Sequence, residues 1–283
     1  MITAKSKQNE LLIADDGTRL IKEDIEIFNQ ELDLGIKYDE FEPYFHPIID
    51  PKTMKIVGCE SLVRWVKNDY RIIEAGKFKD IAKEKNLFTK IDAIIIKKSL
   101  ENYQLWRTKN LVDESFSLTI NLSLDSLLSI NVNELNISVL EYQIDNKYIE
   151  FDISESDISN KEALYKINRL KAAGFKVSLD TLHENNMLLI SLFNVTIDTL
   201  KLNRIHLLDG EEGEHKFRYY QSLTKFSELM GYKVMSKGIE NKEQLKIAKY
   251  LNVDFVQGYY FTPPLNDTKI LGFLNKYREG ILL

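Results

Sequence analysis

Cysteine is almost absent from this sequence, and long apolar runs are absent altogether. Cys59 is the only cysteine among the 283 residues, so an intrachain disulfide is excluded and a reducing, cytoplasmic setting is expected. We interpret Cys59 itself as a small buried hydrophobe. No apolar run approaches the ~20 residues that cross a bilayer, and the polar start, Met1 to Gln8, lacks the apolar core of a signal peptide. A soluble protein with no membrane contact is therefore expected.

A strong excess of either charge is also lacking. The formal net charge is −5 and the isoelectric point is about 5.6. These values argue against a general surface for polyanions, so we predict no direct binding of nucleic-acid polymers, although a local basic pocket could still hold phosphates. The four histidines show neither the i, i+4 spacing of a helical zinc motif nor cysteines nearby, and no histidine-built metal site is expected.

What the sequence does contain is an alternation of two periodicities from Phe41 onward. Short apolar or β-branched runs are predicted as strands at residues 44–49, 56–65, 117–122, 148–153, 176–179, 199–202, 232–235 and 254–260. Stretches with helical spacing lie between them, and Gly174 and Gly231 are expected helix ends. Strands alternating with helices in this way predict an α/β fold, a TIM-like (β/α)8 barrel. A doubly wound sheet is the alternative, but its usual glycine-rich phosphate turn is missing.

The first part of the chain has a different character from the rest. Residues 1–38 are mixed and charged, with one weak amphipathic stretch from Ile21 to Phe28. We predict that residues 1–38 are an N-terminal extension, either helical or disordered, and that residues 39–283 form a single barrel domain.

Isolated polar residues occur in or just after most of the predicted strands. The C-terminal strand ends of such a barrel converge on one face, so these residues are expected to meet at one small-molecule site. They are Glu60, Asn121, Asp152, Asp180, Lys201 and Gln257, with Glu155 close behind Asp152. Taken singly, each is explained as well by a cap, a turn or an ion pair. Their repetition over six strands favours a site.

The chemistry of these side chains suits a phosphodiester. Carboxylate and amide oxygens are ligands that Mg²⁺ and Mn²⁺ prefer, and a metal held between carboxylates and a phosphodiester can activate water for in-line attack. Lys201 is a candidate to neutralise phosphate charge or to orient that water. Arg64, four residues after Glu60, could bind a phosphate with its planar guanidinium, although an ion pair with a neighbouring acid explains it nearly as well.

In order and spacing, the segments from about Phe41 to about Leu265 resemble the EAL domain, a barrel that binds and usually hydrolyses cyclic di-GMP. The matching strings are Glu60-Ser61-Leu62-Val63-Arg64, Asn121-Leu122-Ser123, Asp152-Ile153-Ser154-Glu155-Ser156, Leu200-Lys201-Leu202-Asn203-Arg204 and Gln257-Gly258-Tyr259. The resemblance implies a barrel of the EAL type, cyclic di-GMP as the candidate ligand, and divalent-metal hydrolysis as the usual reaction. The nucleotide contacts that it implies are Glu60, Leu62, Arg64, Asn121, Asp180, Lys201, Lys237 and Gln257. The metal ligands that it implies are Glu60, Asn121, Asp152 and Asp180.

One departure from the family's pattern lies in the loop after the fifth of these strands. Active members have Asp-Asp-Phe-Gly-x-Gly, whereas this chain has Asp180-Thr181-Leu182-His183-Glu184-Asn185. Thr181 therefore replaces the second aspartate of the metal pair. The loop glycines, which support the family's dimer contact, are missing too, so both the metal set and the usual dimer are in doubt.

The more damaging departure is a reversal of charge. The family's Ala-Glu-Gly-Val-Glu is replaced by Ser236-Lys237-Gly238-Ile239-Glu240, so Lys237 stands at the catalytic glutamate. With a dielectric constant of ~20 and a separation of ~5 Å, a lysine repels a divalent ion by roughly 7 kcal/mol, whereas ~1.4 kcal/mol already costs tenfold in affinity. We expect no competent catalytic set, only the remnants Glu60 and Lys201. No cofactor is expected unless residual Mg²⁺ or Mn²⁺ binding survives.

Smaller departures bear on the same site. Asp152 is a shortened form of a ligating glutamate, and His46 stands where the family commonly has a glutamine. Glu240 matches the family's second glutamate, for which capping or bracing the following helix is the favoured role. Lys237 has two interpretations that stay open: drift after catalysis was lost, or an ammonium that contacts the phosphates directly.

Three functions follow from this pattern. The first is an inactive regulatory domain in cyclic di-GMP-related signalling that acts through a protein partner, with or without nucleotide binding. The second is a receptor that binds cyclic di-GMP without hydrolysing it. The third, a working phosphodiesterase with unusual metal chemistry, is disfavoured by Thr181 and Lys237 together.

Overall fold

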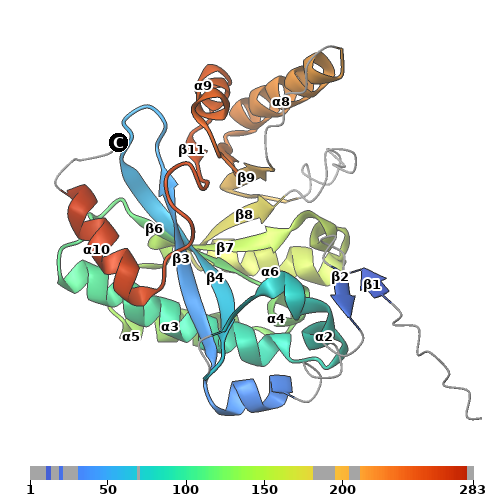
Figure 1. Cartoon of the computed structure of the whole chain (residues 1–283), viewed down its shortest axis with the longest axis vertical. Coiled ribbons are helices and arrows are strands. Elements are labelled where there is room, and N and C mark those ends of the chain that lie inside the picture. The colour runs from blue at the N-terminus through green and yellow to red at the C-terminus, as the bar shows by residue number, and fades with distance from the viewer. Residues whose placement is uncertain are drawn as a thin grey trace, which may run out of the picture.

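The computed structural model describes residues 11–13, 19–21, 31–68, 71–180, 195–203 and 211–278 (Figure 1). Strands β1 (Leu11–Ile13) and β2 (Arg19–Ile21) pair antiparallel near the N-terminus. Residues 31–37 are helical and lead directly into the main sheet. The predicted boundary between residues 38 and 39 stays a prediction.

The main sheet closes on itself as a barrel of eight strands. In chain order they are β3 (Phe41–Ile49), β4 (Ile56–Val66), β6 (Ser117–Asn121), β7 (Ile149–Ser154), β8 (Lys176–Asp180), β9 (Thr199–Leu202), β10 (Lys233–Ser236) and β11 (Phe255–Val256). Strand β3 pairs with β4 on one side and with β11 on the other, and these pairings close the ring. A short strand, β5 (Ile72–Glu74), pairs with β4 outside the ring. The predicted TIM-like α/β barrel is confirmed.

The direction of β3 distinguishes this barrel from an all-parallel one. Strand β3 runs antiparallel to both of its neighbours, whereas the other barrel pairings are parallel. The cause lies in the short turn between β3 and β4. Asp50 and Lys55 are hydrogen-bonded across this turn, and Met54 adopts a φ of 57° within it. A connection this short can only return the chain antiparallel, because a parallel crossover needs a dozen or more residues.

Helices surround the barrel, with α8 and α9 on the side away from α3 (Figure 1). They are η1 (Ala75–Lys77), α2 (Lys79–Glu84), α3 (Phe88–Thr108), α4 (Leu124–Ser129), α5 (Val132–Glu141), η2 (Asn146–Tyr148), η3 (Glu155–Ser159), α6 (Lys161–Ala172), α8 (Glu211–Met230), α9 (Lys242–Tyr250) and α10 (Asp267–Arg278). Asparagine side chains accept hydrogen bonds from first-turn amides at the starts of α5, α6 and α9. The expected helix ends are confirmed, because Gly174 and Gly231 take φ values of 89° and 76° after α6 and α8.

Apolar side chains from strands and helices form one core. Strands β6 to β11 contribute buried aliphatic residues, and α6 adds an inward stripe of Ala163, Ile167 and Leu170. Cys59 is fully buried in this core, as expected. No helix within the described ranges is long and apolar enough to cross a membrane.

Candidate functional site

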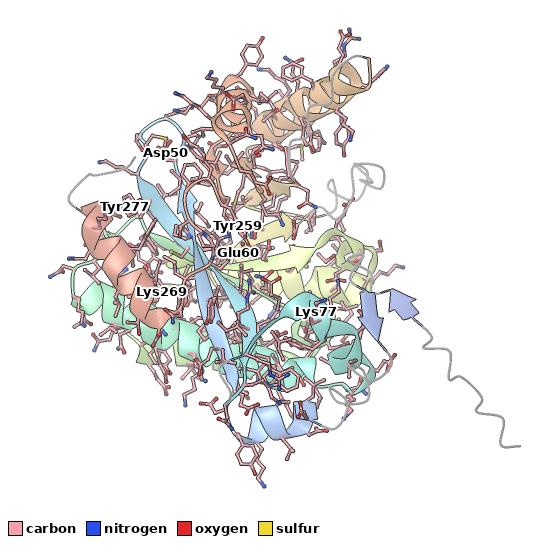
Figure 2. The ribbon with its side chains drawn as sticks, in the orientation of Figure 1. Asp50, Glu60, Lys77, Tyr259, Lys269 and Tyr277 are labelled. Carbon is pink, nitrogen blue, oxygen red and sulfur yellow. The ribbon has the colours of Figure 1, made fainter. Side chains whose placement is uncertain are left out.

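Each of the eight barrel strands brings one polar side chain to the same region. These residues are His46 in β3, Glu60 in β4, Asn121 in β6, Asp152 in β7, Asp180 in β8, Lys201 in β9, Lys237 directly after β10 and Gln257 directly after β11. The register of the pairings places Asn121 beside Asp152 and Asp180 beside Lys201. Glu60 lies near the centre of the molecule (Figure 2). The predicted convergence of polar residues is therefore present, whereas their roles in binding stay predictions.

Lys201 is the central cation of this cluster. Its side chain is fully buried, and its Nζ lies 3.0 Å from Glu60 Oε1 and 2.9 Å from Asp152 Oδ2. The Asn121 amide donates to Glu60 Oε1 at 3.3 Å and to the Ser61 carbonyl at 3.1 Å. One ammonium thus links two carboxylates on strands that are not neighbours, and both carboxylates are also almost fully buried.

The two carboxylates respond differently to this environment. Burial opposes the ionisation of both. At Glu60 the Lys201 and Lys237 ammonium groups outweigh burial and hold the pKa at about 2. At Asp152 burial prevails over Lys201, reinforced by the charges of Asp180 and Glu60, and raises the pKa to about 7. Ser178 donates to Asp152 Oδ1 at 2.6 Å, whereas the 2.9 Å contact with Lys201 is an ion pair without hydrogen-bond alignment. Burial opposes the charge of Lys201, but the carboxylates of Asp152, Glu60 and Asp180 together raise its pKa, so it remains charged.

Lys237 forms a second ion pair in the cluster. Its Nζ lies 2.5 Å from Asp180 Oδ1, and its backbone amide donates to the Leu202 carbonyl at 2.9 Å. Lys237 therefore points into the cluster, where its charge helps to lower the pKa of Glu60 and opposes the rise in the pKa of Asp152. Lys237 is thus paired with Asp180, one of the residues expected from the resemblance to be a metal ligand.

These residues do not fit a divalent metal ion as they are arranged. Glu60 and Asp152 contact the Lys201 ammonium, and Asp180 contacts that of Lys237. The Asn121 amide nitrogen, a donor, faces Glu60. Among the described residues, no group of three or more His, Cys, Asp or Glu side chains is arranged to hold a metal. Each carboxylate expected to coordinate Mg²⁺ therefore already has one oxygen in contact with an ammonium group.

Leu62 and Arg64 lie on the same face of β4 as Glu60, because alternate residues of a strand share a face. The Arg64 guanidinium donates to the Val63 carbonyl at 2.9 Å and lies 3.5 Å from the Glu74 carboxylate. It also lies over the Tyr44 ring, 5.8 Å from the ring centre. Arg64 therefore has an acidic neighbour, as the alternative interpretation expects, and the side chain of this neighbour, Glu74, is 67% exposed; phosphate binding by Arg64 stays a prediction.

The side chains of Gln257 and His46 form hydrogen bonds with backbone carbonyl groups. Gln257 is buried, and its amide donates to the His46 carbonyl at 3.2 Å. The His46 ring places Nε2 3.0 Å from the Thr262 carbonyl, and burial lowers the pKa of this histidine. Both side chains therefore help to hold the segment after β11 against β3.

Sequence reasoning missed two neighbours of the site. Tyr259 is 60% exposed, and its ring centre lies 6.0 Å from that of His46. Ser178 is fully buried and donates to Asp152. A signal existed for Ser178, which lies two residues before Asp180 and so shares its face of β8. Tyr259 belongs to the string Gln257-Gly258-Tyr259 that carries the resemblance, but it lies in a turn, where no strand periodicity indicates which way its side chain faces.

Some predicted features lie outside the described residues, and others were wrong in extent. Thr181 and the altered loop after Asp180 fall in residues 181–194, which the structure does not describe. The predicted last strand, 254–260, was too long, since only Phe255–Val256 is a strand. The chain turns after Val256 because Tyr260 donates to the Ile239 carbonyl instead of to a strand. Glu240 precedes α9, where its backbone amide donates to the Gln244 side chain at 2.6 Å.

Curated proteins similar to this chain include signalling proteins of several bacteria. The cyclic di-GMP phosphodiesterase PdeA of Borreliella burgdorferi is 27% identical over 233 residues, which cover 81% of this chain and 34% of the relative. The cyclic di-GMP phosphodiesterase PdeL of Escherichia coli K12 is 21% identical over 246 residues, or 86% of this chain and 67% of the relative. The chain spans about a third of the length of several other curated relatives that it matches.

Solved structures share the fold over nearly the same region. The EAL enzyme Bd1971 in its form bound to cAMP and cyclic di-GMP has a TM-score of 0.81 at 23% identity, covering 89% of this chain and 69% of that one. An EAL domain protein from Listeria monocytogenes EGD-e has a TM-score of 0.74 at 24% identity, covering 88% and 97%. The family model described as the EAL domain matches residues 29–264. With the barrel and its ring of strand-end residues, this match shows that the chain belongs to the EAL domain family.

Proposed function

We propose that this EAL domain is a non-hydrolytic regulatory protein in cyclic di-GMP-related signalling, which acts through a protein partner with or without bound nucleotide. The observation that carries the proposal is the ion pair between Lys237 and Asp180. It places a fixed positive charge against a carboxylate that hydrolysis would need as a metal ligand. A cytoplasmic location, expected from the single free cysteine, is part of the proposal.

The charges of the cluster oppose the entry of a divalent ion. A divalent ion entering beside Asp180 would meet the Lys237 ammonium and would have to displace it. With an effective dielectric of ~20, each unit charge at ~5 Å contributes roughly 7 kcal/mol of repulsion to a divalent ion, before screening reduces it. Even a small remaining part of this repulsion outweighs the ~1.4 kcal/mol that changes affinity tenfold. Metal-activated attack on the phosphodiester therefore lacks its metal.

The direct test is to incubate the protein with cyclic di-GMP and either Mn²⁺ or Mg²⁺, and to separate the products by chromatography. We expect no linear dinucleotide above the level of a protein-free control. PdeL of E. coli, named as a cyclic di-GMP phosphodiesterase, would serve as the positive control under the same conditions. Turnover comparable to that of PdeL would overturn the proposal in favour of a working phosphodiesterase.

A reversal experiment tests the assignment of the site. The double variant Thr181→Asp and Lys237→Glu should raise the affinity for Mn²⁺ by restoring acids at both departures. Calorimetric titration with the metal alone measures this change. Unchanged metal binding in the folded double variant would mean that the match between these positions and the family's metal site is wrong.

A cyclic di-GMP receptor is the second candidate, favoured by the cationic groups that remain at the strand ends. Lys237 and Arg64 are both near the surface of the cluster, and the acid that contacts Arg64 is mostly exposed. EAL domains of FimX from Pseudomonas aeruginosa and from Xanthomonas citri have been solved with cyclic di-GMP bound. Calorimetry with cyclic di-GMP tests this candidate, and binding no tighter than millimolar would remove it while leaving the partner-based function in place.

A further inference from the structure

The two lysines of the cluster differ in their access to solvent. The Lys201 side chain is 0% exposed and is paired with Glu60 and Asp152, which are almost fully buried themselves, so it cannot reach an entering ligand without rearrangement. The Lys237 side chain is 19% exposed, and that of Asp180 is 25% exposed. Lys237 is therefore the ammonium of this cluster that an anion from solvent can contact.

The position of Lys237 is fixed from two directions. Its backbone is tied to β9 through the Leu202 carbonyl, and its side chain is held by Asp180. An ammonium group has three N–H donors, and the contact with Asp180 uses one of them. Lys237 can therefore keep its partner and still donate to the oxygen of a phosphate.

We propose that Lys237 is a built-in monovalent cation that takes over the role of a divalent metal in holding a ligand's phosphodiester. This inference rests on the nucleotide-binding form of the proposed function and deepens it, because it states how the anion is bound. Binding of a cyclic dinucleotide would then be independent of Mg²⁺ and Mn²⁺. It would depend instead on the charge at position 237.

The charge balance of the cluster supports this exchange of roles. Three carboxylates, those of Glu60, Asp152 and Asp180, face two ammonium groups. With all five groups charged the net charge is −1, and the ammonium of Lys237 offsets the carboxylate of Asp180 beside which a phosphate would bind. A glutamate at position 237 would make the local charge more negative by two units, which should attract a divalent ion and repel a bare phosphodiester.

The experiment is calorimetry of the full chain with cyclic di-GMP, in EDTA and in millimolar Mg²⁺. For the wild type we expect a Kd that agrees within ~3-fold between the two conditions. For Lys237→Glu we expect affinity to fall ~100-fold or more in EDTA and to recover in Mg²⁺. Lys237→Met should lose affinity in both conditions, because it has neither the ammonium nor a ligand for the metal.

Lys246→Glu is the matched control, since it makes the same charge change at an exposed position on the outer helix α9. It should bind like the wild type in both conditions. Circular dichroism confirms that each variant is folded; if Lys237→Glu fails to fold, Lys237→Met and the wild-type metal series still test the inference.

Three results would overturn the inference. They are wild-type binding that strengthens tenfold or more with Mg²⁺, Lys237→Met binding that equals the wild type, and the absence of any wild-type binding. None of these results touches the proposed lack of hydrolysis, which the product assay decides separately. Product formation by the wild type would remove the proposed function even where the binding results agree.

Discussion

Lys201 shows how a single buried side chain connects distant parts of this sequence. Its partners Glu60 and Asp152 come from β4 and β7, and all three side chains are almost removed from solvent. Such an ion pair is not strong evidence for stability, because desolvation opposes its formation. Removing one partner, however, strongly destabilises the folded state, because the remaining charges stay buried without a counter-charge.

At this scale we predict a large effect of removing the central cation. Lys201→Met should lower the free energy of unfolding by about 3–5 kcal/mol at neutral pH, because Glu60 and Asp152 lose their buried counter-charge. Urea denaturation followed by circular dichroism measures the change. Lys233→Met is the control: its pair with Asp254 is exposed, so it should cost less than about 1 kcal/mol. Equal effects of the two variants would contradict the buried ion pair.

A second prediction at the residue scale concerns pH. Burial raises the pKa of Asp152 to about 7, above the value of about 3.9 in an unfolded chain. Between these values the folded state keeps a proton that the unfolded state has lost, so this group's contribution to stability falls as pH rises. The largest slope is about 1.4 kcal/mol per pH unit.

Comparison with Asp152→Asn isolates this contribution, because the amide does not titrate. The difference in unfolding free energy between wild type and Asp152→Asn should shift against the wild type as pH rises from about 4 to 7. Denaturation curves at several pH values measure this difference. A constant or opposite shift would mean that Asp152 is ionised throughout that range. Glu60 contributes in the opposite sense at lower pH: its pKa of about 2 means that its stabilisation is lost as pH falls through that value.

At the scale of elements, the connections after β10 and β11 are held together by backbone hydrogen bonds. Gln257 donates from its backbone to Ser236, Ile239 donates to Gln257, and Tyr260 donates to Ile239. Gly258 lies in the middle of this contact, and a Cβ added there would lie 2.1 Å from the Ile239 carbonyl oxygen. This close approach holds the loop that carries Lys237 against the end of the barrel.

Gly258→Ala should therefore destabilise the protein by more than about 2 kcal/mol, because backbone atoms on both sides have to move. Thermal unfolding measures the effect. Gly272→Ala is the matched control in α10, where no atom lies within 4 Å of the added Cβ. In an exposed helical position this change should leave stability equal or raise it by up to about 1 kcal/mol. If Gly258→Ala unfolds at the wild-type temperature, the two loops are not packed as described.

At the scale of the whole molecule, the extent of the folded unit is the main question. The sequence predicts that residues 1–38 lie outside the barrel, whereas the family match begins at residue 29. Leu32 is 0% exposed and belongs to the core, and Glu31 forms an ion pair with Lys67 at 2.8 Å. We infer that residues 31–37 pack as part of the barrel domain.

This inference is tested by a pair of substitutions in the same helical segment. Leu32→Ala should lower the free energy of unfolding by about 2–5 kcal/mol, because a fully buried leucine leaves a cavity. Leu34→Ala, at a side chain that is 48% exposed, should cost less than about 1 kcal/mol. Chemical denaturation of both variants gives the comparison. Similar small effects would support the boundary at residue 38 instead.

The strands and the meeting of polar side chains at the strand ends could be predicted from the sequence, because both depend on local patterns, whereas the roles of these side chains in binding stay predictions. Apolar runs mark all eight barrel strands, and polar residues interrupting them mark the strand ends. The match of these strings to the EAL pattern also located Lys237 as a reversed charge. Strand lengths were less certain: the last strand is short because its continuation bonds to Ile239.

What only the tertiary structure decided is how the charges pair. The direction of β3 depends on its turn, and the partners of Lys201 and Lys237 depend on the barrel, which brings together residues that lie far apart in the sequence. Sequence alone left Lys237 open between drift and a functional ammonium. Its contact with Asp180 fixes the position of that ammonium group. The physical reason is electrostatic attraction: the position of a charged side chain in the barrel depends on the opposite charges of the neighbouring strands, which the sequence alone does not place.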